Sequence, residues 1–167
     1  MTPSAKPATP TTPKPITPCL WFGGNAMEAV QFYTSIFKNS SIGAVTHYGK
    51  EGFEVHGMAE GTVLTVSFNL NGQPFTALNG APAFQYTEAV SFQVFCDTQE
   101  EIDHYWNRLT DGGSEGQCGW LKDRFGVSWQ VVPTILPQLL TDPARAGKVT
   151  NVFLQMKKFD IAKLLQA

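Results

Sequence analysis

Side chains that could hydrogen-bond a small molecule recur in two strand-like stretches of this chain. Ser91 and Gln93 share one face of a predicted strand, and Ser128 and Gln130 share one face of another, because successive strand residues point to opposite faces. A glutamine in the middle of such a strand needs hydrogen-bonding partners or a wet cavity. For Ser91 and Gln130, lining a binding site and making a structural hydrogen bond are equally open interpretations.

Two further side chains could complete such a site. Asn79 could add an amide and Trp120 a stacking surface, and Phe22 and Phe68 are additional aromatic candidates. A polar but uncharged lining with aromatic rings suits a neutral or planar organic ligand. The predicted ligand-binding residues are Asn79, Ser91, Gln93, Trp120, Ser128 and Gln130.

Catalysis would require different side chains. Asp123, Glu115 and Cys118 are the candidates for a general acid, a general base or a nucleophile in an enzyme that uses no cofactor or is assisted by its substrate. The sequence does not decide between such an enzyme and a protein that only binds its ligand, so no catalytic residue is assigned. No cofactor is expected.

The three histidines offer one alternative metal site. His47 and His56 flank a hairpin-like loop that also carries Glu54, and two histidines with a carboxylate could form a metal-binding face. Two solvated histidines are the favoured interpretation, since loops lie on the surface. His104, beside Asp103 on a predicted helix, is expected to be solvated.

Hydrophobic periodicity and turn signals predict the secondary structure. Asn71-Gly72 is the strongest hairpin signal in the chain. The expected strands are 16–22, 42–48, 62–70, 74–79, 89–96, 117–122 and 127–132, with a short strand near 114, and the expected helices are 25–38, 98–112 and 144–157.

The order of these elements repeats. Asn25 and Thr98 are equivalent helix caps, each with a glutamate three residues later. Tyr33 and Trp106 are the second members of aromatic pairs, and each lies eight residues after its cap. The repeat predicts an α+β fold of two tandem βαβββ modules. Two such sheets side by side would form a curved, funnel-shaped surface, which is a place for a small molecule.

The repeat also predicts the domain organisation. Residues 1–15 are mostly Pro, Thr, Ala and Lys and are expected to form a flexible or polyproline-like tail. Residues 16–133 form the domain, with module 1 at 16–80 and module 2 at 89–133. Residues 134–167 are expected to form a C-terminal helical extension.

Composition excludes several classes of partner. The 167 residues carry a formal net charge of −2, which argues against nucleic acid or an anionic membrane as the partner. No apolar run is long enough for a membrane span. The three cysteines are unclustered and are interpreted as reduced core thiols of a cytoplasmic protein.

Several motifs carry a resemblance to a known family. They are FGGNAMEAVQFY at 22–33, ALNG at 77–80, QEEIDHYW at 99–106, QCGWLKDRFGVSWQVVP at 117–133 and MKKFDI at 156–161. In these motifs the chain resembles the PhnB-like, or 3-demethylubiquinone-9 3-methyltransferase-like, proteins of the vicinal oxygen chelate superfamily. That superfamily includes glyoxalase I, extradiol dioxygenases and bleomycin-resistance proteins. The resemblance implies the glyoxalase/bleomycin-resistance/dioxygenase fold and a homodimer.

The resemblance also bears on metal binding. Metal-dependent relatives hold a divalent ion with four inward His and Glu residues, and the equivalent positions here are Pro18, Thr76 or Leu78, Ser91 and Gln130. None of these side chains suits a divalent ion. We therefore expect a metal-free protein that binds an unidentified small organic molecule.

The alternative function is a cofactor-independent or metal-dependent enzyme of the lyase, isomerase or dioxygenase type. Methyltransferase activity is not expected, because the sequence has no glycine-rich, nucleotide-binding loop and no alternating strand–helix order.

Overall fold

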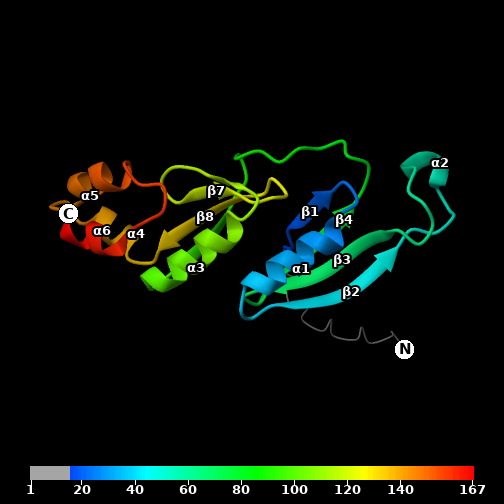
Figure 1. Ribbon diagram of the computed structural model, residues 1–167, viewed down its shortest axis with the longest axis horizontal. Helices are drawn as coiled ribbons and strands as arrows, with labels where there is room; N and C mark the ends of the chain where they lie inside the picture. Colours follow the sequence, from blue (N-terminus) through cyan, green and yellow to red (C-terminus); the bar gives the residue numbers. More distant parts are fainter. Residues whose placement is uncertain (1–15) are drawn as a thin grey trace, which may run out of the picture.

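The computed structural model describes residues 16–167, so the predicted tail at 1–15 lies outside the described residues. The elements follow the predicted order in both modules (Figure 1). In chain order they are β1 (Cys19–Phe22), α1 (Ala26–Ile36), β2 (Ser41–His47), α2 (Phe53–His56), β3 (Val63–Leu70), β4 (Gln73–Asn79), β5 (Phe92–Cys96), α3 (Gln99–Leu109), β6 (Ser114–Glu115), β7 (Trp120–Lys122), β8 (Ser128–Pro133), α4 (Leu136–Thr141), α5 (Ala146–Phe153) and α6 (Ile161–Gln166).

The strands form two four-stranded sheets with the same topology. Their orders are β1-β4-β3-β2 and β5-β8-β7-β6. In each sheet the first strand pairs in parallel with the fourth, and the remaining neighbours are antiparallel. β1 and β5 are edge strands of separate sheets. These mixed sheets confirm the predicted α+β fold of two βαβββ modules.

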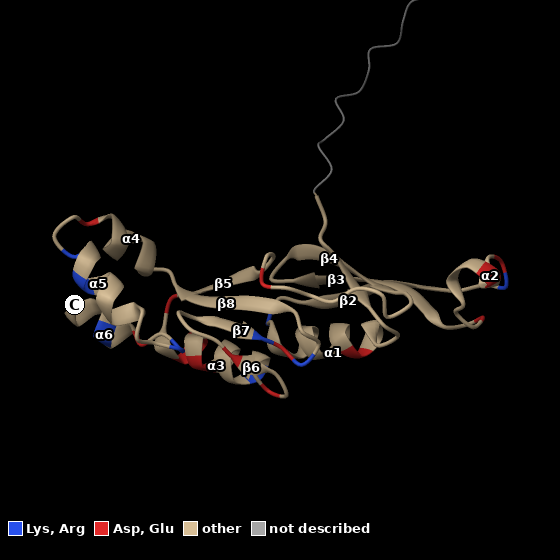
Figure 2. Cartoon of the chain, turned by 90° about the horizontal axis from the view of Figure 1, so that it is seen from above, with Lys and Arg blue, Asp and Glu red and all other residues tan. Residues whose placement is uncertain are grey.

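Both module helices lie on the same side of the sheets (Figure 2). Alternation along β1, β3, β4 and β5 buries every second residue against these helices. In β3, for example, Val66, Phe68 and Leu70 are buried. The opposite sheet face has no helix from either module over it, so it carries the more polar residues.

Aromatic side chains join the two modules. The ring of Tyr33 on α1 lies 5.5 Å from that of Trp129 on β8, and the ring of Phe37 lies 5.1 Å from that of Tyr105 on α3. His104 Nε2 is 2.9 Å from the carbonyl oxygen of Ile36 at the end of α1. His104 is exposed, as expected, and its ring also satisfies a helix-terminal carbonyl.

Three segments differ from the sequence-based expectation. The connection at 49–61 contains the short helix α2, and β7 begins only at Trp120. Cys118 and Gly119 precede β7 with positive φ angles of 56° and 80°, which a strand cannot accommodate. The predicted helix at 144–157 ends early, at Phe153.

The early end of α5 has a physical cause. The carbonyl groups of Met156 and Lys157 accept hydrogen bonds from the backbone amides of Cys118 and Gly119, at 2.7 Å each. This pairing draws the C-terminal segment against module 2. Phe159, which is fully buried, packs so closely on Gly119 that a side chain at position 119 would overlap its ring.

In the described part of the chain, residues 16–167, no helix has the length and apolar character needed to cross a bilayer.

Candidate functional site

Most of the predicted binding residues lie together on the helix-free face of the second sheet. The strand register aligns Gln93, Gln130 and Trp120 in one row across β5, β8 and β7. Ser128 lies two residues before Gln130 on the same face, and Ser91 directly precedes β5. Because alternate residues of a strand share a face, the sequence alone predicted which of these side chains lie on the same face of each strand.

The hydrogen bonds of Gln130 are made within the protein. Its Nε2 donates to Ser91 Oγ at 2.8 Å, and its Oε1 accepts a long hydrogen bond of 3.4 Å from Gln93 Nε2. Of the two interpretations left open for Ser91 and Gln130, the structural hydrogen bond is therefore present. Ligand contact by these residues stays a prediction.

A cavity of about 490 Å³ lies between the edge strand β1 and the strands β5 and β8. The linking segment 85–90 forms part of its wall. We call this the seam cavity, and its lining residues are Pro18, Cys19, Leu20, Gln85, Tyr86, Thr87, Val90, Phe92, Val127 and Ser128. None of these side chains carries a formal charge at neutral pH.

Ser128 is the one predicted site residue in this lining. Its side chain is 2% exposed, and its Oγ has no hydrogen-bond partner among residues 16–167. Buried polar groups are nearly always satisfied, so an orphaned hydroxyl in a cavity wall requires an explanation.

The rest of the seam cavity was not predicted. Tyr86 is fixed by a 2.6 Å hydrogen bond from its phenol to the carbonyl oxygen of Trp21, and burial raises the pKa of this phenol. Cys19 was expected to be a core thiol, but the residue is exposed. The surroundings still remove part of the water around its thiol, and this desolvation raises the pKa of the thiol. The segment from Gln85 to Val90 has no hydrophobic periodicity, so its sequence gave no signal that it lines a cavity.

Asn79 requires a correction. It lies on the face that packs against α1, is 1% exposed, and does not join the other candidates. Its Oδ1 accepts hydrogen bonds from the backbone amides of Gly24 (3.2 Å) and Ala26 (2.9 Å), and its Nδ2 donates to the carbonyl of Val63 (3.0 Å). Phe22 and Phe68 are likewise buried in the core.

Gln93 and Trp120 border other hollows. Gln93 lines a groove of about 310 Å³ whose other walls are largely aromatic. Trp120 lines a hollow of about 170 Å³ beside Glu88, Glu115 and Lys122. The six predicted residues therefore do not converge on one cavity.

The three catalytic candidates are separated in the structure. Asp123 is 3% exposed. Its Oδ2 accepts hydrogen bonds of 2.8 Å from both Tyr33 Oη and Trp129 Nε1, and its Oδ1 accepts from the backbone amides of Phe125 and Val127. Burial raises the pKa of this carboxyl, although these hydrogen bonds oppose the shift. Asp123 therefore binds four donors, and because Tyr33 belongs to module 1, this carboxylate links the two modules in the core.

Of the other two candidates, Glu115 lies at the surface and Cys118 is partly buried. Glu115 is exposed and accepts a hydrogen bond from Trp106 Nε1, which is the main cause of the lowered pKa of its carboxyl. Cys118 is partly buried, and its Sγ lies 3.7 Å from the carbonyl oxygen of Phe153. Neither residue lines the seam cavity.

The described residues do not fit a divalent metal. No group of three or more His, Cys, Asp or Glu side chains in residues 16–167 could hold an ion. Gln130, at the position where metal-dependent relatives would carry a ligand, has its amide engaged by Ser91. His56 bonds within its own loop, to the carbonyl of Glu51 and the amide of Met58.

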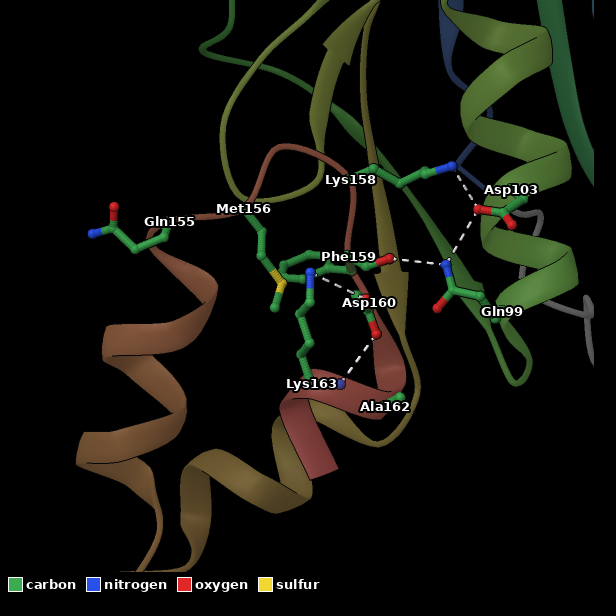
Figure 3. Close-up of a pocket in the computed structure, with 9 residues that line it drawn as sticks. All are labelled: Gln99, Asp103, Gln155, Met156, Lys158, Phe159, Asp160, Ala162 and Lys163. Carbon is green, nitrogen blue, oxygen red and sulfur yellow. Dashed lines mark hydrogen bonds and ion pairs between the residues drawn. The ribbon is translucent and has the colours of Figure 1, made fainter. Parts of the chain in front are cut away.

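Another cavity lies between α3 and the C-terminal segment 155–163 (Figure 3). It measures about 540 Å³, and each of its charged groups has a partner. Lys158 pairs with Asp103 at 2.7 Å, and Lys163 lies 3.5 Å from Asp160. Gln99 also bonds both Asp103 and the carbonyl of Phe159. These contacts attach the C-terminal segment to α3.

Comparisons with known proteins agree with this geometry. The family model described as 3-demethylubiquinone-9 3-methyltransferase matches residues 14–132. The PhnB protein from Bacillus cereus is 37% identical in a match that covers 72% of this chain and 100% of that protein, with a TM-score of 0.64.

More distant structures share the fold alone. Protein PA1353 from Pseudomonas aeruginosa is 24% identical over 71% of this chain and 96% of that protein, with a TM-score of 0.57. The fosfomycin resistance protein FosX from Listeria monocytogenes is 14% identical over 77% of this chain and 98% of that protein, with a TM-score of 0.51. A search of curated proteins finds no match. From its matched residues and its two βαβββ modules, the chain belongs to the PhnB-like, 3-demethylubiquinone-9 3-methyltransferase-like family of the glyoxalase superfamily.

Proposed function

We propose that this PhnB-like protein binds a small, uncharged and mostly apolar organic molecule in the seam cavity, without a metal. The observation that carries the proposal is the unpartnered hydroxyl of Ser128, which is 2% exposed and lines that cavity. A ligand that hydrogen-bonds this hydroxyl would remove a cost of about 1–3 kcal/mol, the usual penalty for an unsatisfied buried polar group.

The chemistry of the lining supports an uncharged ligand. Leu20, Val90, Phe92 and Val127 supply apolar surface, and no lining residue carries a formal charge. A charged molecule would lose its hydration there without gaining an ionic partner. The volume of about 490 Å³ falls within the range of roughly 300–1,000 Å³ typical of small-molecule sites.

Binding without turnover is the form of the proposal that this lining favours. Asp123, Glu115 and Cys118 lie outside the lining, so the cavity lacks a carboxylate for general acid or base catalysis. A cofactor-independent or metal-dependent enzyme of the same superfamily is the alternative. The family description names a methyltransferase, and the two mixed sheets differ from the doubly wound sheet that commonly binds nucleosides.

Ser128→Ala tests the proposal directly. The variant removes an unpartnered hydroxyl, so without ligand it should be as stable as the wild type or up to about 1 kcal/mol more stable. A thermal-shift screen of uncharged fragments should find compounds that stabilise the wild type, and Ser128→Ala should weaken their binding about tenfold, the equivalent of one hydrogen bond.

Ser40→Ala is the matched control, because Ser40 Oγ is also buried without a partner among the described residues but lies outside the cavity lining. Fragment binding should be unchanged in this variant. Equal affinities for the wild type and Ser128→Ala would reject the assignment of the site.

Three further measurements separate the alternatives. Mass spectrometry of a fragment after incubation with the protein should show no change in its mass, and turnover would favour the enzyme. Elemental analysis of protein purified without chelators should find no stoichiometric metal.

The homodimer implied by the resemblance stays a prediction, which light scattering coupled to size-exclusion chromatography can test.

A further inference from the structure

A second hollow adjoins Phe92, as the seam cavity does. Phe92 lines both hollows. The second measures about 310 Å³, and we call it the aromatic groove. Its lining residues are Phe37, Leu70, Asn71, Gln73, Phe75, Phe92, Gln93, Val94, Phe95 and Trp129, which come from both modules.

The floor of the groove is built from rings in different orientations. Phe92 lies 5.3 Å from both Phe75 and Trp129, at interplanar angles of 69° and 48°. Phe37 lies 5.5 Å from Trp129 at 32°. Phe37, Phe75 and Trp129 are buried in this packing, in the offset and edge-to-face geometry that aromatic pairs favour. The half-buried Phe92 and the exposed Phe95 therefore present the aromatic surface that a flat guest could cover.

Phe95 is the exposed wall of the groove. It is 53% exposed, whereas its neighbours Val94 and Cys96 are buried. A large aromatic side chain beside a hollow gains free energy when a ligand covers it, because its apolar surface leaves water.

The rim of the groove supplies hydrogen-bond acceptors. Gln73 donates its amide hydrogen to the carbonyl of Pro74, and Gln93 donates to Gln130. The side-chain oxygens of Gln73 and Gln93 accept no hydrogen bond from residues 16–167. The lining contains no formally charged residue, so a charged guest would be unpaired.

From this lining we propose that the aromatic groove is a second binding site, which takes a flat, uncharged aromatic ring carrying an N–H or O–H donor. The rings of Phe92 and Phe95 contact the guest, and the oxygens of Gln73 and Gln93 accept its hydrogen. The two sites share Phe92, but Ser128 lines the seam cavity alone, so a ring in the groove makes no use of its hydroxyl.

Indole is a suitable probe, and 1-methylindole is its matched analogue without the N–H donor. Saturation-transfer NMR should detect indole binding, and 1-methylindole should bind several-fold more weakly. Phe95→Ala should weaken indole binding about three- to tenfold, the usual worth of one aromatic contact. Gln73→Leu should remove much of the preference for indole over 1-methylindole.

Phe53→Ala is the matched control for Phe95→Ala. Phe53 on α2 is 55% exposed, close to the 53% of Phe95, and does not line the groove. Indole should bind this variant like the wild type. Unchanged indole binding by Phe95→Ala would overturn the proposal.

Two outcomes separate this inference from the proposed function. Ser128→Ala should bind indole like the wild type, and loss of indole binding in that variant would place the ring in the seam cavity and reject the groove as its site. A second copy of the chain is the competing occupant of the groove. If Phe95→Ala converts a dimer to a monomer in sedimentation velocity, the groove is an interface and the proposal fails.

Discussion

Helices α1 and α3 occupy equivalent places in the two modules, but the hydrogen bonds at their starts come from different parts of the chain. Asn79, at the end of β4, bonds the amide of Ala26 from 53 residues away. Asn25, the local cap residue of α1, makes no side-chain cap hydrogen bond. In module 2 the local residue Thr98 accepts from the amide of Glu101 at 3.2 Å.

The equivalent aromatic residues differ in the same way. Tyr33 on α1 donates to the buried Asp123 of module 2, which is 90 residues away. Trp106 on α3 donates to the exposed Glu115, only nine residues away. The same repeat position therefore has a buried, four-donor carboxylate as its partner in module 1 and a solvated carboxylate in module 2.

The difference indicates that the N-terminal cap of α1 and its aromatic residue Tyr33 are held by distant residues, whereas the cap of α3 and its equivalent residue Trp106 are held by local ones. A helix that depends on distant residues gains its full stability only when the whole domain is assembled, whereas local caps act as soon as the helix forms. Variants that remove the distant partners should therefore destabilise the protein more than variants that remove the local ones.

The largest effect is expected from Asp123→Ala. This variant leaves the donors of Tyr33 and Trp129 and two backbone amides without their acceptor in the core. Because each unsatisfied buried donor costs about 1–3 kcal/mol, the free energy of unfolding should fall by about 4 kcal/mol, as measured by urea denaturation. Asp111→Ala, which removes an exposed partner of Arg124, should cost less than about 1 kcal/mol.

Asn79→Ala should have the next largest effect. It removes the acceptor for Gly24 and Ala26 and the donor to Val63. We expect a loss of about 2 kcal/mol, since replacing a helix-capping side chain by alanine costs about 0.5–2 kcal/mol and the bond to Val63 is lost as well. Asn25→Ala should change stability by less than about 0.5 kcal/mol. If Asn25→Ala lost more stability than Asn79→Ala, the conclusion that Asn79 caps α1 would be contradicted.

The contrast between the two caps also shows how far sequence can predict this molecule. Hydrophobic periodicity and turn residues act over a few positions, so they locate the strands, the helices and the repeat. A cap signal at Asn25 and one at Thr98 look alike in sequence, and only the position of β4 beside α1 decides that Asn79 replaces Asn25.

The same limit applies to the candidate site. Strand alternation located Ser128, Gln130 and Gln93 on one face, because that property is local. Asn79 was included only as an amide that could join the site, without a face assigned to it. Alternation also missed the segment from Gln85 to Val90, whose place in the seam cavity depends on the approach of the two sheets. Asp123 was identified as chemically notable, but its four donors come from folded contacts.

Thr98→Ala should cost about 1 kcal/mol, the typical effect of losing one local cap. Thr98→Ser, which keeps the hydroxyl, should recover most of the stability. Hydrogen exchange should show faster exchange mainly at the amide of Glu101 and the first turn of α3, because the remaining contacts of module 2 are untouched. Equal acceleration in α1 would show that the two helices are not separable in this way.

Glu115→Gln should have the smallest effect. The substitution keeps an oxygen that can accept from Trp106 Nε1 and removes only the charge that faces Lys157 at 3.4 Å. Exposed ion pairs are screened by solvent and contribute little, so the urea midpoint should match that of the wild type within error. A clear fall in the midpoint would mean that Glu115 holds α3 as firmly as Asp123 holds α1. Glu115 would then contribute to stability despite its exposure. Burial of the carboxylate would no longer explain why one helix is stabilised by distant residues and the other by local ones.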